Sequence, residues 1–105
     1  TSYFDSKVGL ITRTLEENGQ LDNTIIIVTA DHGDMLGERG LWYKMNFFEH
    51  SGRVPLIMAG PGVAGGAVSS SCSLVDILPT MVDIAASTGA AKPALGQGRV
   101  CLIEP

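Results

Sequence analysis

One short stretch of the sequence has residue types suited to binding a metal ion and an anion. Asp31 and His32 directly follow an apolar run, and Lys44 lies twelve residues after His32. An ionised carboxylate and a neutral imidazole are both metal ligands, and Gly33 allows a backbone turn in which the two neighbouring side chains converge. A lysine ammonium beside such a metal would place two positive centres around one small anion, which favours phosphate or sulfate.

Other residues of this stretch have both a chemical and a structural interpretation. His50 is the second histidine of the chain and could act as general acid toward a leaving group, although a structural or surface histidine is the commoner case. The aromatic residues suit packing that anchors a loop, or cation–π contact with a quaternary ammonium: Trp42, Tyr43, Phe47 and Phe48. Spacing alone also allows Asp-His-Gly to be a simple turn, so a site and a structural loop both stay open.

The elements that must position these residues are predicted from hydrophobic spacing. Apolar residues recur every three or four positions over residues 3–17, as on one face of a helix that Asn18-Gly19 ends. The run TIIIVTA at 24–30 is apolar or β-branched throughout, which is typical of a strand covered on both faces in a parallel sheet. Such a strand places Asp-His-Gly at its C-terminal end, where ligands bind in open α/β sheets.

A long loop and a second strand follow. Residues 33–52 are rich in glycine, charge and aromatic rings without a steady period, so we expect a functional loop with a helical turn near 46–50. PLIMA at 55–59 predicts a second buried strand. Residues 63–71 are small and polar, which indicates an exposed turn or a short strand.

The last predicted elements are a helix and a short strand. VDILPTMVDIAASTG at 75–89 predicts a helix with Asp76 as N-cap, Pro79 in the first turn and Gly89 as its end. A short strand is expected at 100–103. The fold class is therefore α/β, in the order helix, strand, long loop, strand, helix.

Composition excludes several classes of function. The 105 residues suffice for one domain, and 45% hydrophobic residues are normal for a folded soluble protein. The net charge is −4 and the seven Lys and Arg residues are scattered, which argues against nucleic acid and anionic membranes as partners. The longest apolar runs fall far short of the roughly 20 residues of a membrane span. Cys72 and Cys101 lack a zinc spacing, and free thiols in a cytosolic protein are favoured over a disulfide.

A longer match carries more information than any of these features alone. The segment TIIIVTADHGDMLGERGLWYKMNFFEHSGRVPLIMAGPGV, followed by SLVDILPTMVDIA, resembles the C-terminal part of the catalytic domain of sulfatases in the alkaline-phosphatase superfamily. Within that family it is most similar to choline sulfatases. The resemblance runs over residues 3–86 and implies that residues 1–105 are a single partial domain, a fragment of an alkaline-phosphatase-like sandwich. Both ends of the sequence fit a piece of a longer protein.

The resemblance implies roles for individual residues. Asp31 and His32 would be ligands of a divalent metal, calcium first and manganese as the alternative, and Lys44 would contact the sulfate oxygens. The formylglycine nucleophile of the family derives from a Cys/Ser-x-Pro/Ala-x-Arg motif, and this sequence has no such motif. The expected function is therefore a fragment of a metal-dependent sulfuric ester hydrolase that holds part of the site and is inactive alone.

Partners and competing functions follow from the same reasoning. A small sulfate ester such as choline sulfate is the expected substrate, and the cytoplasm is the expected location. Two strands without their neighbours would expose edges, so we expect a homo-oligomer or a domain-swapped form. One alternative is a phosphonate or phosphate ester hydrolase of the same superfamily. The other is a small non-catalytic α/β module in which Asp-His-Gly is only a turn.

Overall fold

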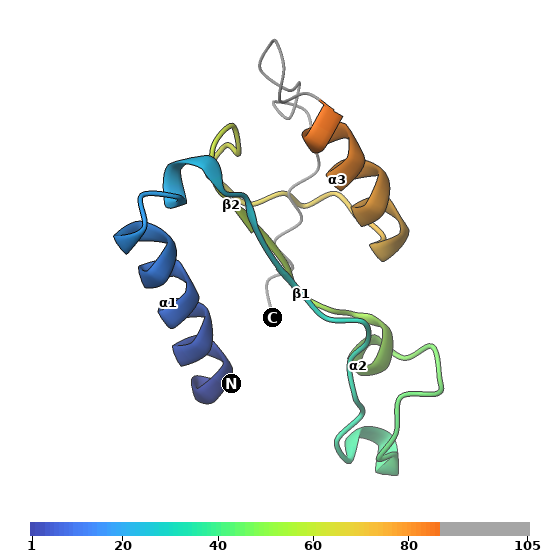
Figure 1. Ribbon diagram of the computed structural model, residues 1–105. Helices are drawn as coiled ribbons and strands as arrows, with labels where there is room; N and C mark the ends of the chain where they lie inside the picture. Colours follow the sequence, from blue (N-terminus) through green and yellow to red (C-terminus); the bar gives the residue numbers. More distant parts are fainter. Residues whose placement is uncertain (87–105) are drawn as a thin grey trace.

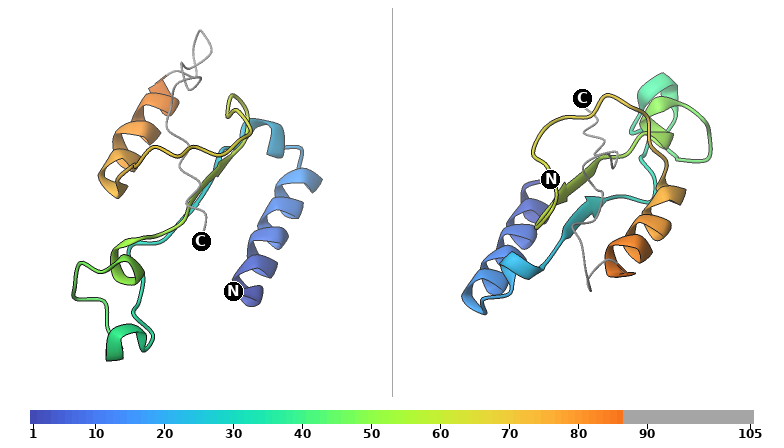
Figure 2. Two further views of the ribbon diagram at one scale, coloured as in Figure 1. Left: turned by 180° about the vertical axis from the view of Figure 1, so that it is seen from behind. Right: turned by 90° about the horizontal axis from the view of Figure 1, so that it is seen from above.

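The computed structural model describes residues 1–86 and confirms an α/β arrangement. Two longer helices lie on opposite sides of a pair of short strands, and the segment between the strands forms a separate lobe (Figures 1 and 2). The α-helices and strands, in chain order, are α1 (Ser2–Glu17), β1 (Ile26–Thr29), α2 (Glu49–Gly52), β2 (Leu56–Ala59) and α3 (Ile77–Ala86). Within the same residues, 3-10 turns complete the order: η1 (Leu21–Asn23), η2 (Glu38–Gly40) and η3 (Leu74–Asp76).

The first helix, α1, matches the predicted helix to within one residue at its start. Its end follows from Gly19, which takes a left-handed φ of 65° and donates its N–H to the Glu16 carbonyl at 2.9 Å. None of its residues is buried, and Phe4 and Ile11 of its apolar face are 56% and 58% exposed. The amphipathic pattern thus predicted the helix, but residues 1–86 do not cover its apolar face.

The two strands pair antiparallel, so the expectation of a parallel sheet is wrong. Ile26 pairs with Ala59 and Thr29 pairs with Leu56. The apolar run of β1 indicated that both faces are covered, but such a run carries no information on strand direction. The direction is set by the connection, which leaves the end of β1 and returns to the same end of the pair without a crossover.

The connection between the strands is packed rather than structureless. It contains η2 and α2, and the helical turn expected near 46–50 is found at Glu49–Gly52. Met35 is 1% exposed, and Val54 at the return to β2 is 8% exposed. The best-buried apolar side chains therefore lie in this connection and at the start of β2, where they hold the lobe that carries Asp31, His32 and Lys44 (Figure 1).

The start of α3 differs from the prediction. Asp76 is the last residue of η3 and not the N-cap, because the chain is already helical from Leu74 onward. Its carboxylate instead accepts the backbone N–H of Ser73 at 3.2 Å, one half of a capping box, so that Ser73 is the cap. Pro79 lies in the first turn of α3, as predicted.

The remaining predictions from the sequence are confirmed only in part. Residues 63–71 contain bends and no strand, and most of them are exposed, which favours the exposed segment over the short strand. Cys72 is disulfide-bonded, so the expectation of a free thiol is wrong at this residue. Cys101, the helix end at Gly89 and the strand at 100–103 lie outside the described residues. Within residues 1–86, no helix has both the length and the apolar character needed to cross a membrane.

Candidate metal and sulfate site

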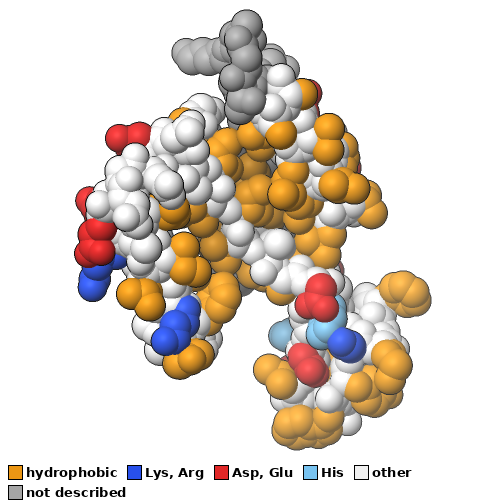
Figure 3. Space-filling view, viewed as in Figure 1, with side chains coloured by type: hydrophobic (Ala, Val, Ile, Leu, Met, Phe, Trp, Pro, Cys, Tyr) orange, Lys and Arg blue, Asp and Glu red, His pale blue; other side chains and the backbone are white. Residues whose placement is uncertain are grey.

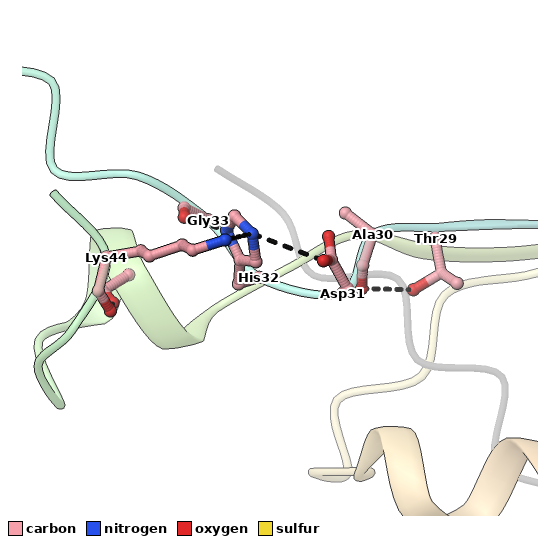
Figure 4. Close-up of polar contacts among 7 residues, drawn as sticks. Thr29, Ala30, Asp31, His32, Gly33 and Lys44 are labelled. Atoms are coloured by element: carbon pink, nitrogen blue, oxygen red, sulfur yellow. Dashed lines mark hydrogen bonds and ion pairs between the residues drawn. The ribbon is translucent and has the colours of Figure 1, made fainter.

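Asp31 and His32 lie just beyond the end of β1, as the sequence indicated. The Asp31 Oδ2 and His32 Nε2 atoms are 3.3 Å apart, so both side chains converge on one point (Figure 4). The Asp31 side chain is 86% exposed and that of His32 35% exposed, which leaves the pair open to solvent. An exposed pair of this kind contributes little to stability, so its proximity is of interest mainly for binding.

The hydrogen bonds of the His32 ring determine its tautomer. Nδ1 lies 2.7 Å from the carbonyl oxygen of Gly33. Because a carbonyl only accepts, Nδ1 must carry the proton and donate it. In the neutral ring Nε2 then keeps its lone pair, so its 3.3 Å approach to the Asp31 carboxylate is no hydrogen bond and leaves two electron-pair donors side by side. A backbone carbonyl holding the other nitrogen in this way is the usual arrangement behind a metal-binding histidine.

Lys44 reaches this pair from the far side of the lobe. Its Nζ forms a hydrogen bond with Nε2 of His32, so the ammonium donates to the imidazole lone pair (Figure 4). The structure therefore brings together the three residues singled out from the sequence, across a gap of twelve residues. Figure 3 shows acidic, histidine and Lys or Arg side chains together on the lobe, with hydrophobic side chains around them.

A close approach between Gly33 and α2 holds the Asp-His-Gly turn in place. The Gly33 N–H donates to the Ser51 carbonyl at 2.8 Å. A Cβ at residue 33 would lie 2.1 Å from the carbonyl oxygen of His50, a separation that real Cβ atoms do not show. Glycine is therefore required here for space rather than for an unusual φ.

His50 is less well placed than the other three candidates. It lies in α2 with an exposed side chain, and its backbone carbonyl rather than its ring faces Gly33. Among residues 1–86, no hydrogen bond or ion pair joins its ring to Asp31, His32 or Lys44. The structure thus puts His50 beside the turn without bringing its imidazole into the group.

The aromatic residues of the lobe have packing roles in two cases. The Arg39 guanidinium lies 4.6 Å from the centre of the Phe48 ring, in a cation–π contact. The Trp42 ring lies over Gly37, where a Cβ would come within 3.1 Å of it. Phe47, in contrast, is fully exposed. Phe48 and Trp42 thus each make a contact within the loop although they stay 41% and 74% exposed, whereas the Phe47 ring faces solvent.

One residue of the site was missed by reasoning from the sequence. Ser51 is 3% exposed, and its hydroxyl donates to the carbonyl of Lys44 and lies 3.1 Å from that of Asn46. Nothing in the sequence distinguishes this serine from the exposed serines of the chain, because its role depends on burial produced by the fold.

The geometry fits a cation only as part of a larger ligand set. A carboxylate oxygen and an unprotonated imidazole nitrogen 3.3 Å apart can both contact one ion. In the part of the chain that the structure describes, no third His, Cys, Asp or Glu joins them. Asp31 and His32 thus offer two protein ligands, fewer than the four to eight that metal ions in proteins take.

Comparisons with known proteins identify the family. The sulfatase family profile matches residues 1–87. The chain is 56% identical over 84 residues to a choline-sulfatase of Rhizobium meliloti (strain 1021), an alignment that covers 80% of this chain and 16% of that protein. Arylsulfatase K of Danio rerio is 45% identical and that of Homo sapiens 48% identical, each over 82 residues. The chain spans about a sixth of the length of these curated relatives, and it belongs to the sulfatase family.

Proposed function

We propose that this chain is part of a metal-dependent sulfuric ester hydrolase similar to choline sulfatases, and that it supplies part of the metal and sulfate site. The observation that carries this proposal is the convergence of Lys44 on the Asp31–His32 pair. An anion-binding cation beside two metal ligands is an arrangement suited to a sulfate ester. Family membership supports the reaction class.

Asp31 and His32 are the proposed metal ligands. The hydrogen bond from Nδ1 to the Gly33 carbonyl holds the His32 ring so that Nε2 is the ligating atom. Calcium is the first candidate, as the resemblance to sulfatases implies, and manganese is the alternative; manganese also accepts the imidazole nitrogen of His32. When bound, the cation would polarise a sulfate oxygen as a Lewis acid.

Lys44 is the proposed sulfate contact. Its ammonium is exposed at the end of a flexible stem, so it can leave the His32 lone pair and turn to a sulfate oxygen while staying in the site. The same lone pair cannot serve both the ammonium and a metal ion. Binding of a metal at His32 would therefore free Lys44 for the substrate.

His50 is the proposed proton donor to the leaving alcohol. The support is its position on α2, where its backbone carbonyl lies beside Gly33 of the Asp-His-Gly turn. Its ring would have to turn from solvent toward the substrate to act as a general acid.

A small sulfate ester such as choline sulfate is the proposed substrate. The similarity to a choline-sulfatase supports the choline moiety. The fully exposed ring of Phe47 suits contact with a quaternary ammonium, since cation–π attraction needs a free ring face. The cytoplasm is proposed as the location from the resemblance alone; the disulfide at Cys72 weighs against it, because cytosolic thiols are kept reduced.

A homo-oligomer or domain-swapped form is the proposed state of the isolated chain. An apolar groove runs between α1 and one face of the strand pair, lined by Phe4, Val8, Ile26, Val28 and Ile57. Each strand has a single neighbour among the described residues, which leaves backbone groups at both edges. A second copy of the chain could cover both features.

Titration of the 105-residue chain with Ca²⁺ and with Mn²⁺ tests the metal site. We expect weak binding that is lost in Asp31→Ala and in His32→Ala, because each substitution removes one of only two ligands. Asp22→Ala is the matched control, since Asp22 is an exposed carboxylate in η1, away from the lobe. Equal binding by wild type and Asp31→Ala would refute the assignment.

An activity assay tests whether the isolated chain is inactive. The same samples should not hydrolyse choline sulfate or an aryl sulfate, and hydrolysis that survives repurification would overturn the proposed inactivity.

A further inference from the structure

Ser51 connects the two halves of the candidate site through different atoms. Its hydroxyl donates to the carbonyl of Lys44 and lies 3.1 Å from the carbonyl of Asn46. Its own backbone carbonyl accepts the N–H of Gly33 at 2.8 Å. The side chain therefore holds the lysine segment, while the main chain holds the Asp-His-Gly turn.

The lysine segment depends on such a contact. Residues 41–48 form no helix or strand, and besides the Ser51 hydroxyl the Lys44 carbonyl accepts only a local bond, from the Asn46 N–H at 2.9 Å, among the hydrogen bonds of residues 1–86. A lysine side chain is long and has several rotatable bonds, and the ammonium can meet His32 reliably only if its backbone is held. The hydroxyl has a single proton, which it donates to the Lys44 carbonyl with the Asn46 carbonyl close by, and because the residue is buried, loss of this bond would leave polar groups unsatisfied.

We propose that Ser51 is a positioning residue that holds Lys44 beside the Asp31–His32 pair, by its hydroxyl and independently of its contact with Gly33. The relevance to sulfate binding rests on the proposed function, whereas the positioning itself is a property of the metal-free chain.

Nuclear magnetic resonance on the metal-free 105-residue chain tests the proposal. Wild type should show a nuclear Overhauser effect between the Lys44 side chain and the His32 ring, together with slow hydrogen exchange of the Gly33 amide. In Ser51→Ala the Overhauser effect should disappear while the Gly33 amide stays protected, because alanine keeps the backbone carbonyl. Ser51→Thr keeps the hydroxyl and should restore the Overhauser effect.

A matched serine variant controls for loss of any hydroxyl. Ser6→Ala removes a hydroxyl that donates to the Tyr3 carbonyl at 2.7 Å in α1, and it should leave both signals unchanged. If Ser51→Ala unfolds the lobe, Ser51→Cys offers the same comparison with a side chain of similar size and weaker donor strength.

Two results would overturn the proposal. The first is an Overhauser effect that persists in Ser51→Ala, which would mean that the hydroxyl does not hold the lysine. The second is joint loss of the Overhauser effect and of Gly33 protection in both Ser51→Ala and Ser51→Cys, which would make Ser51 a general packing residue. A separate addition of Mn²⁺ to wild type tests the metal site: absence of broadening at the His32 ring would refute that site and leave the Ser51 comparison intact.

Discussion

At the scale of single residues, a backbone carbonyl determines which His32 nitrogen carries the proton. The Gly33 carbonyl fixes the tautomer of His32, and the lone pair left on Nε2 accepts a hydrogen bond from Lys44 beside Asp31. Asp31, His32 and Lys44 could be predicted from the sequence, because their side chains have recognisable chemistry. Their backbone hydrogen-bond partners could not be predicted, because every residue has a carbonyl.

Replacement of Gly33 tests the close approach between the turn and α2. Gly33→Ala places a Cβ 2.1 Å from the His50 carbonyl oxygen, so the turn must move away from α2 and lose the bond to Ser51. We expect a loss of about 1–3 kcal/mol in the free energy of unfolding, measured with urea, as for other overpacked positions.

Gly52→Ala is the control for this change. Gly52 lies in α2, and a Cβ at this residue would meet nothing within 4 Å; alanine also favours a helix. Its stability should equal or exceed that of wild type. Equal stability of the Gly33 and Gly52 variants would show that the close approach does not constrain the lobe.

At the scale of elements, hydrophobic spacing predicted where helices and strands lie but not how they associate. The predicted ranges of α1, β1 and β2 agree with the structure within about two residues, the usual uncertainty of element ends. The parallel pairing and the Asp76 cap were wrong, because strand direction and the first helical residue depend on how the chain returns and not on local composition. Ser51 was missed for the same reason, since burial is a property of the folded lobe.

The loop between the strands behaves as a packed element, and Met35 tests this. Its side chain is 1% exposed, so Met35→Ala should cost about 2–5 kcal/mol in the free energy of unfolding by removing buried apolar contacts. Met45→Ala is the same substitution at a residue that is 82% exposed, and it should change stability by no more than about 0.5 kcal/mol. Similar losses in a urea titration of both variants would contradict a packed lobe.

At the scale of the whole molecule, many large apolar side chains of residues 1–86 stay exposed. Ile26 and Val28 of β1 face the groove beside α1, opposite Ala59 and Ile57 of β2. On α3, Leu78 is 71% exposed. A chain that spans about a sixth of its relatives would be expected to leave such surfaces open, because the neighbouring segments of a full domain would cover them.

Light scattering tests whether a second copy covers the groove. We expect a mass of at least twice 11.0 kDa at high concentration. Ile57→Lys places a charge on the apolar face and should shift the chain toward monomer. Gln20→Lys adds the same charge at an exposed loop position and should not. A monodisperse monomer of the wild-type chain would overturn the proposed self-association.

The antiparallel register affects how the length of the segment between β1 and β2 can change. Because Thr29 and Leu56 are paired, the lobe leaves and re-enters the sheet at neighbouring points. The entropic cost of closing a flexible loop rises only with the logarithm of its length, by about 0.6 kcal/mol for each doubling. Insertions at exposed positions of the lobe, away from the buried Met35 and the close approach at Gly33, can therefore be accommodated while the strands keep their register.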